Sequence, residues 1–175
     1  AASDVYKRQE EYTMSKYLDD WHIGETYVTD GRTITETDVV AFAALTGDFH
    51  QNHTNEEYMK NGQFGKRIAH GLLGLAYSHG LLFRLNLITD NSIALLSVQD
   101  WKFVKPIFIG DTIHVKLTVT DIRFSRTKRD RGVMNVLFEV MNQNDEICQS
   151  GTKVFMMKRE VKESKIASAS WTPAQ

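Results

Sequence analysis

Asp48 and His53, an aspartate and a histidine five residues apart, are the residues whose types and spacing best suit catalysis in this chain. Asp48 follows Gly47 in a predicted turn, and Gly71 stands at the head of a later apolar segment. A carboxylate and an imidazole held together can act as a general acid–base pair. A glycine in the first turn of a helix offers its backbone N–H to a developing oxyanion. These residues predict chemistry on a carbonyl compound.

Structural roles for the same residues stay open at this stage. Asp48 suits a turn after a helix, because aspartate readily accepts hydrogen bonds from nearby backbone N–H groups. His53 can equally be a satisfied core histidine or a neighbour of a helix cap. Asp48, His50, His53 and His70 together also offer the nitrogen and oxygen ligands that zinc takes. Their spacing matches no known metal motif, so we expect neither a metal nor another cofactor.

The segments around the pair predict helices that fix it in place. Thr35 and Asp38 resemble a capping box, followed by an apolar stripe that stops at Gly47. Thr54 with Glu57 predicts a second cap and a short helix over about residues 55–60, which places His53 immediately before it.

Downstream, the pattern predicts one long helix and then a meander of strands. Residues 68 to about 87 are apolar nearly all round, as in a helix buried on most faces. Four segments rich in β-branched and aromatic residues follow, at 93–103, 112–124, 133–141 and 147–158, with the clearest turn at 142–145. Helices followed by antiparallel strands predict an α+β fold.

Two separated motifs carry a family resemblance. The first is the run 42–48 with His53, Phe64 and 68–73, and the second is the run 101–111. Together they resemble the MaoC-like dehydratases, which include the (R)-specific enoyl-CoA hydratases of hot-dog fold. The likeness covers roughly residues 20–158. It implies a long central helix wrapped by a curved antiparallel sheet, and two subunits that join their sheets edge to edge as a homodimer or a higher homo-oligomer.

The resemblance also assigns roles to residues of this chain. It implies Asp48 and His53 as the catalytic pair and Gly71 as the backbone oxyanion donor. Five further residues are candidates for binding substrate: His50, Phe64, His70, Ser78 and His79. A structural hydrogen-bonding role is the alternative for His70, and a buried polar side chain satisfied by a neighbouring strand is the alternative for Ser78 and His79. Two departures concern the substrate, because His50-Gln51 replaces the family's usual Asn-Pro and Ser78-His79 lie near its pocket serine.

Three functions remain in view. The first is a lyase that reversibly hydrates a 2-enoyl-CoA to an (R)-3-hydroxyacyl-CoA, or dehydrates a branched or dicarboxylic hydroxyacyl-CoA. The second is an acyl-CoA thioesterase, because one fold can host several thioester chemistries. The third is an acyl-CoA-binding module without catalysis.

The composition limits the partners and the cellular compartment that we expect for this chain. The chain has 175 residues, 42% of them hydrophobic, and a formal net charge of -1, so no global charge attracts nucleic acid or membrane. Its single cysteine, Cys148, fits the reducing cytoplasm. The basic stretch 123–131 predicts a charged hairpin tip, with coenzyme A phosphates as the alternative ligand. We expect one domain over residues 14–159, an N-terminal extension over 1–13 and a C-terminal tail over 160–175.

Overall fold

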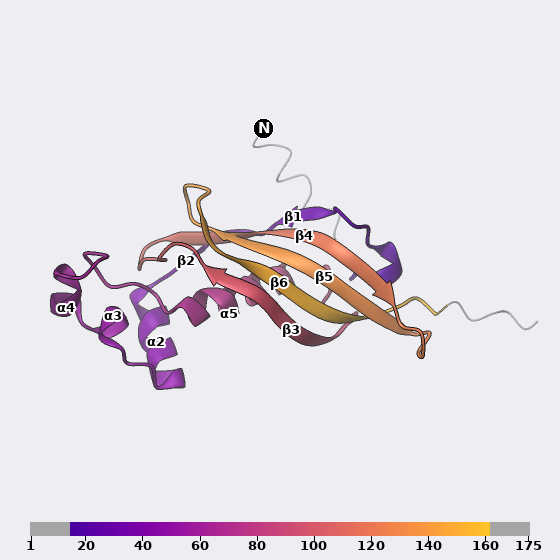
Figure 1. The fold of residues 1–175 in the computed structure, drawn as a ribbon, viewed down its shortest axis with the longest axis horizontal. Helices are drawn as coiled ribbons and strands as arrows, with labels where there is room; N and C mark the ends of the chain where they lie inside the picture. The colour runs from indigo at the N-terminus through magenta and orange to yellow at the C-terminus, as the bar shows by residue number, and fades with distance from the viewer. Residues whose placement is uncertain (1–14, 162–175) are drawn as a thin grey trace, which may run out of the picture.

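The computed structural model describes residues 15–161, which form a curved antiparallel sheet with helices against it (Figure 1). The sheet order is β1-β4-β5-β6-β3, and β2 pairs with β4. The strands are β1 (Thr26–Val28), β2 (Arg32–Thr33), β3 (Ser92–Phe103), β4 (Thr112–Phe124), β5 (Arg131–Met141) and β6 (Ile147–Lys158). The helical segments are η1 (Leu18–Asp20), α2 (Glu36–Thr46), α3 (Gln51–Thr54), α4 (Glu56–Lys60) and α5 (Gly71–Arg84). The expected extension 1–13 lies outside the described residues, as does the expected tail from residue 162 onward.

The α+β prediction is confirmed, and the four long strands fall where the pattern placed them. The turn at 142–145 is also confirmed, with Asp145 donating its N–H to the carbonyl of Asn142 at 3.1 Å. The strands β1 and β2 were not predicted. They have only three and two residues, too few for an alternating pattern to stand out.

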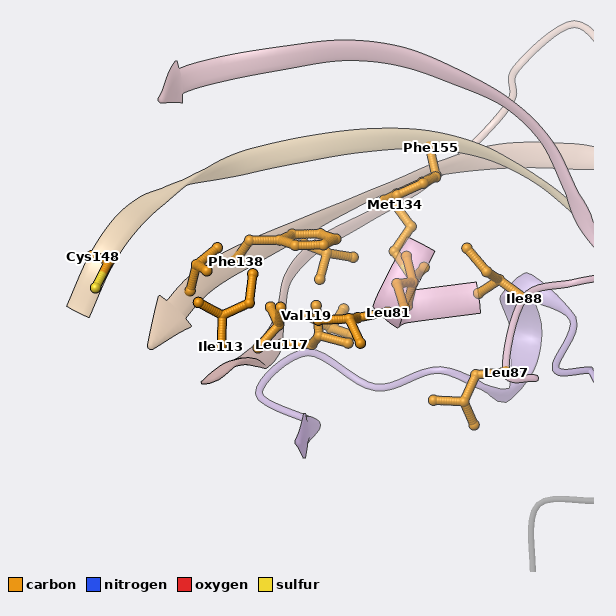
Figure 2. Close-up of a cluster of buried hydrophobic side chains, with 14 of the residues drawn as sticks. Leu81, Leu87, Ile88, Ile113, Leu117, Val119, Met134, Phe138, Cys148 and Phe155 are labelled. Atoms are coloured by element: carbon orange, nitrogen blue, oxygen red, sulfur yellow. The ribbon is translucent and has the colours of Figure 1, made fainter. Parts of the chain in front are cut away.

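The core lies between the concave face of the sheet and α5. Alternate residues of β4 and β5 are buried, as expected of strands with one covered face. Figure 2 shows Leu117, Met134, Phe138 and Phe155 of the sheet gathered toward Leu81 of α5. Burial of such a cluster is the main source of stability in a domain of this size.

The long helix α5 is buried on most faces, as predicted, and exposes one face. Leu73, Leu81 and Leu82 are buried, but Leu72 on another face is 58% exposed. The prediction of a helix buried on most faces is therefore confirmed, and one side of α5 faces outward.

Two capping predictions have different outcomes. The box at the start of α2 is confirmed, because the N–H of Asp38 donates to Thr35 Oγ1 at 3.2 Å and the helix ends at Gly47 with φ of 79°. The second cap is wrong. Asn55, not Thr54, accepts the hydrogen bond of the first turn of α4, but the short helix itself is confirmed and His53 precedes it on α3.

The helices α2, α3 and α4 gather at one end of the sheet, whereas the β4–β5 hairpin tip lies at the opposite end (Figure 1). Within one protomer the basic tip is therefore remote from His53. Two of its cations are paired locally, Arg123 with Asp121 and Arg131 with Asp130. The charged-hairpin interpretation is the one that this placement favours.

Candidate active site

His53 lies on α3 with its ring held by the loop that precedes α5. Its Nδ1 is 2.8 Å from the carbonyl oxygen of Ile68. Since a carbonyl can only accept, Nδ1 carries the hydrogen, and Nε2 of the neutral ring holds a free lone pair. Burial lowers the pKa of His53, against the opposing effects of the Ile68 hydrogen bond and the Asp48 charge. The ring is thus a neutral base near pH 7.

Asp48 lies just past the end of α2, as predicted, and its side chain is exposed. Its Oδ1 accepts the N–H of His50 at 3.2 Å, and its own N–H donates to Thr46 Oγ1 at 3.3 Å. These turn contacts fix the carboxylate against the helix end. Nitrogen and oxygen atoms of Asp48, His53 and His70 lie within 4.8 Å of one another, a separation that one water bridges with two hydrogen bonds of about 2.8 Å.

His70 contacts both Asp48 and His53. It is 2% exposed, and its Nε2 donates to the backbone oxygen of Asp48 at 2.9 Å. Its ring stacks on that of His53, with centroids 3.8 Å apart and planes 27° apart. His70 therefore positions both members of the pair. Its Nδ1 is buried without a hydrogen-bond partner in the described part of the chain.

Gly71 is the first residue of α5, where a backbone N–H has no acceptor within the helix and the helix dipole favours negative charge. A Cβ on Gly71 would lie 2.8 Å from the ring of Phe103, so a larger residue here would require that exposed side chain to move. The Gly71 carbonyl accepts a hydrogen bond from Gln149 Nε2 at 3.0 Å. Gln149 in turn accepts one from Trp101 Nε1 at 3.2 Å.

A pocket of about 560 Å³ opens beside this group. His53 and Gly71 line it together with Phe64, which the sequence analysis assigned to substrate binding. The remaining lining is largely apolar and comes from the segments 68–72 and 103–107, with Gln63 and Gln149 adding polar groups. A mainly apolar pocket with a few convergent polar groups is typical of a small-molecule site.

The other residues expected to bind substrate lie in three different settings. His50 caps α3, where its Nδ1 accepts the N–H of Asn52 at 3.2 Å. Ser78 is fully buried and donates to the carbonyl of Leu75 at 2.6 Å. His79 is half-buried, with its ring parallel to that of Phe155. None of these three lines the pocket beside His53.

The sequence analysis did not predict Arg67, which connects α2, α3 and α4 through hydrogen bonds. Its guanidinium bonds both carboxylate oxygens of Glu36 on α2, at 2.7 and 2.8 Å, and Glu56 on α4 at 2.7 Å. It also lies 3.4 Å from the backbone oxygen of His53. The two carboxylates raise the pKa of Arg67, so its charge is permanent. Its position next to Ile68 gave no signal in the sequence.

The comparisons with known proteins identify the family of this chain. The family model described as MaoC like domain matches residues 20–141. The (R)-specific enoyl-CoA hydratase of Rhodospirillum rubrum is 35% identical over 107 residues, covering 61% of this chain and 71% of that protein. Protein MaoC of Klebsiella aerogenes also matches, and this chain covers 31% of its length.

Similar solved structures identify the fold. A monoamine oxidase regulatory protein from Archaeoglobus is 31% identical with a TM-score of 0.79, covering 86% of this chain and 99% of that one. A Mycobacterium tuberculosis protein described as having a double hotdog fold gives a TM-score of 0.71 at 19% identity, covering 91% of this chain and 47% of that one. The hot-dog fold expected from the sequence is therefore confirmed, and the chain belongs to the MaoC-like dehydratase family.

Proposed function

We propose that this protein is a hydro-lyase that reversibly adds water to a 2-enoyl-CoA thioester and yields an (R)-3-hydroxyacyl-CoA. The observation that carries the proposal is the close approach of Asp48 and His53, together with a pocket that His53 and Gly71, the first residue of α5, both line. The similarity to an (R)-specific enoyl-CoA hydratase supports the same reaction.

In this mechanism one water lies between the carboxylate of Asp48 and Nε2 of His53. As its oxygen adds to C3 of the enoyl group, it gives a proton to the pair, which supplies a proton to C2. Negative charge develops on the thioester oxygen, where the Gly71 N–H and the N-terminus of α5 stabilise it. Dehydration follows the same steps in reverse. Side chains and backbone alone perform every step.

A test of the function uses crotonyl-CoA with the wild-type protein. The proposal predicts loss of the conjugated enoyl absorbance, formation of (R)-3-hydroxybutyryl-CoA and no free thiol. Release of coenzyme A as a free thiol would instead identify a thioesterase. Binding of crotonyl-CoA without either product would identify a binding module.

A metal hydratase is the second candidate, because Asp48, His53 and His70 form a group whose donor atoms are close. His53 and His70 each donate one ring hydrogen to a backbone carbonyl, as metal-binding histidines commonly do. Their rings are stacked, however, and nearly parallel rings aim their lone pairs poorly at one ion about 2.0 Å away.

Chelation separates these two mechanisms. We expect turnover of crotonyl-CoA to survive exhaustive dialysis against a chelator, because side chains activate the water. Loss of turnover on chelation, with recovery on adding zinc, would establish the metal hydratase instead.

A further inference from the structure

A second polar group lies along α5 from Gly71, around Lys153 of β6. Lys153 is 1% exposed. Its Nζ donates to the carbonyl of Leu75 at 3.2 Å and to Oγ of Ser78 at 2.8 Å. Its polar contacts within residues 15–161 include no carboxylate. A buried ammonium without a counterion is costly, so this lysine needs an explanation.

Two aromatic rings compensate only partly for the burial of Lys153. Its Nζ lies 4.2 Å from the centroid of the Phe138 ring and 5.1 Å from that of Trp101. Burial still lowers the pKa of Lys153 to about 7. An apolar side chain would fill this space without that cost, whereas an anion beside Nζ would stabilise the ammonium.

His79 adds an unsatisfied polar atom to the surroundings of Lys153. Its Nδ1 is buried without a hydrogen-bond partner in the described residues. Burial, and then the charge of Lys153, lower the pKa of His79. The other side chains that face Lys153 are Ser78 on α5, Trp101 on β3 and Phe138 on β5. The group thus contains two nitrogen bases and no acid.

This group adjoins the proposed thioester site through Gln149 and Trp101. Gln149 lies four residues before Lys153 on β6, so both side chains point to the same face of the strand. Gln149 bonds the carbonyl of Gly71 and lines the pocket. The indole of Trp101 lies between Gln149 and Lys153, because its Nε1 donates a hydrogen bond to Gln149 and its ring faces Lys153 Nζ.

The spacing suits a short acyl chain. Seven residues of helix separate Gly71 from Ser78, a rise of about 10 Å. A four-carbon diacid spans roughly 6 Å between its terminal oxygens, and a hydrogen bond of about 3 Å at each end brings the reach to about 12 Å. We infer that Lys153 and His79 bind a carboxylate at the far end of the acyl chain, so that the substrate is a short dicarboxylic acyl thioester. This inference rests on the proposed function.

The test compares two saturated, unreactive thioesters of equal length, succinyl-CoA and butyryl-CoA, by titration calorimetry. The wild-type protein should bind succinyl-CoA about 10- to 100-fold more tightly, the range expected for a hydrogen-bonded charge pair. Lys153→Met should bring the ratio of the two affinities close to one. Met fills the same space without a charge, so the variant should fold. Lys158→Met, at an exposed lysine of the same strand, should keep the wild-type ratio.

Proton uptake gives a readout that a purely structural lysine would not change. At pH 8 the free Lys153 is largely neutral, and a carboxylate beside it raises its pKa. Succinyl-CoA binding should therefore take up close to one proton, measured by repeating the titration in buffers of different ionisation enthalpy. Butyryl-CoA should take up none, and Lys153→Met should abolish the uptake.

The possible outcomes distinguish failure of the carboxylate subsite from failure of the proposed hydratase function. Equal wild-type affinities for the two thioesters, or an unchanged ratio in Lys153→Met, would overturn the carboxylate subsite and leave hydration of crotonyl-CoA intact. Binding of neither thioester by the wild-type protein would contradict the proposed function and the subsite together.

Discussion

Two neighbours of His53 oppose the effect of burial on its protonation. Burial disfavours the imidazolium most strongly, whereas the hydrogen bond to Ile68 and the charge of Asp48 favour it. The net result is a pKa below the ordinary value of 6.5. A base with a low pKa stays neutral, and hence able to accept a proton, over a wider range of acid pH.

The pH dependence of hydration should reflect this balance. We predict that kcat/KM falls on the acid side with a midpoint below 6.5, because protonation of His53 removes the base. Asp48→Asn should move the midpoint to still lower pH, since it removes an anion that favours the imidazolium. The measurement is kcat/KM across pH 4.5–8 for both proteins, with circular dichroism to establish folding. A midpoint above 6.5 in the wild-type protein would contradict the assignment.

Residues that act through local spacing were predictable from the sequence. The family resemblance singled out Asp48, His53 and Gly71 as site candidates, and a turn, a short interval and a helix start in a single segment predicted their positions. Gln149 and Lys153 could not be predicted, because their partners Gly71 and Leu75 are 78 residues distant in the chain. Only the pairing of β6 with α5 across the core brings them together.

Arg67 connects the helices that position Asp48 and His53, the proposed catalytic pair. Its bidentate contact with Glu36 fixes the start of α2, the helix that Asp48 follows, and its contact with Glu56 fixes α4. Tyr77 adds a tie from α5, donating to Asp38 Oδ1 at 2.5 Å. The pKa of Asp38 falls to about 2 under its hydrogen-bonded partners, which outweigh its burial. Both ties thus orient α2 against the rest of the site.

We predict that Arg67→Met acts on catalysis more than on stability. Partly exposed ion pairs contribute little to folding, so Tm should change by only a few degrees. A small displacement of His53 relative to Asp48 should lower kcat by roughly 10- to 100-fold with KM little changed. The control is Lys60→Met, which breaks an exposed ion pair on α4 and should leave both constants unchanged. Wild-type kcat in Arg67→Met would show that Arg67 does not position the pair.

Among the helices and strands, the sequence predicted those that have a regular apolar pattern or a capping motif of their own. The four long strands and α2 fall in this class. The start of α4 was misassigned because Thr54 and Asn55 are both good caps, and the choice depends on contacts that Thr54 makes with Phe49 and His50. The strands β1 and β2 exist through pairing with β4, which no local pattern records.

In the molecule as a whole, the long strand β3 lies at one edge of the sheet. β3 pairs with β6 on one side, and no described strand covers its other side. It carries exposed apolar side chains, among them Leu95, Leu96 and Val98. A long apolar edge of this kind favours pairing with another chain, and we propose that a second copy of this protein covers it. The TM-scores of the solved relatives establish the fold but leave this assembly a proposal.

Sedimentation of the purified protein tests the homodimer. We predict a dimer at micromolar concentration and a shift toward monomer in Leu96→Asp, because a carboxylate on the edge strand would be desolvated in the interface. Ile23→Asp provides the control, since Ile23 is an exposed residue before β1 at the other edge. A wild-type protein that stays monomeric and fully active would rule out this assembly as a requirement.

The central claim is that Asp48 and His53 together activate water for addition to an enoyl thioester. The most direct measurement is the rate of crotonyl-CoA hydration by the wild-type protein, Asp48→Asn, His53→Gln and the double variant. Loss of general acid–base action should lower kcat by about 10²- to 10⁴-fold in each single variant. The double variant should lose little more, because the two residues act on one water. Single variants that fold normally and keep wild-type turnover would contradict the account.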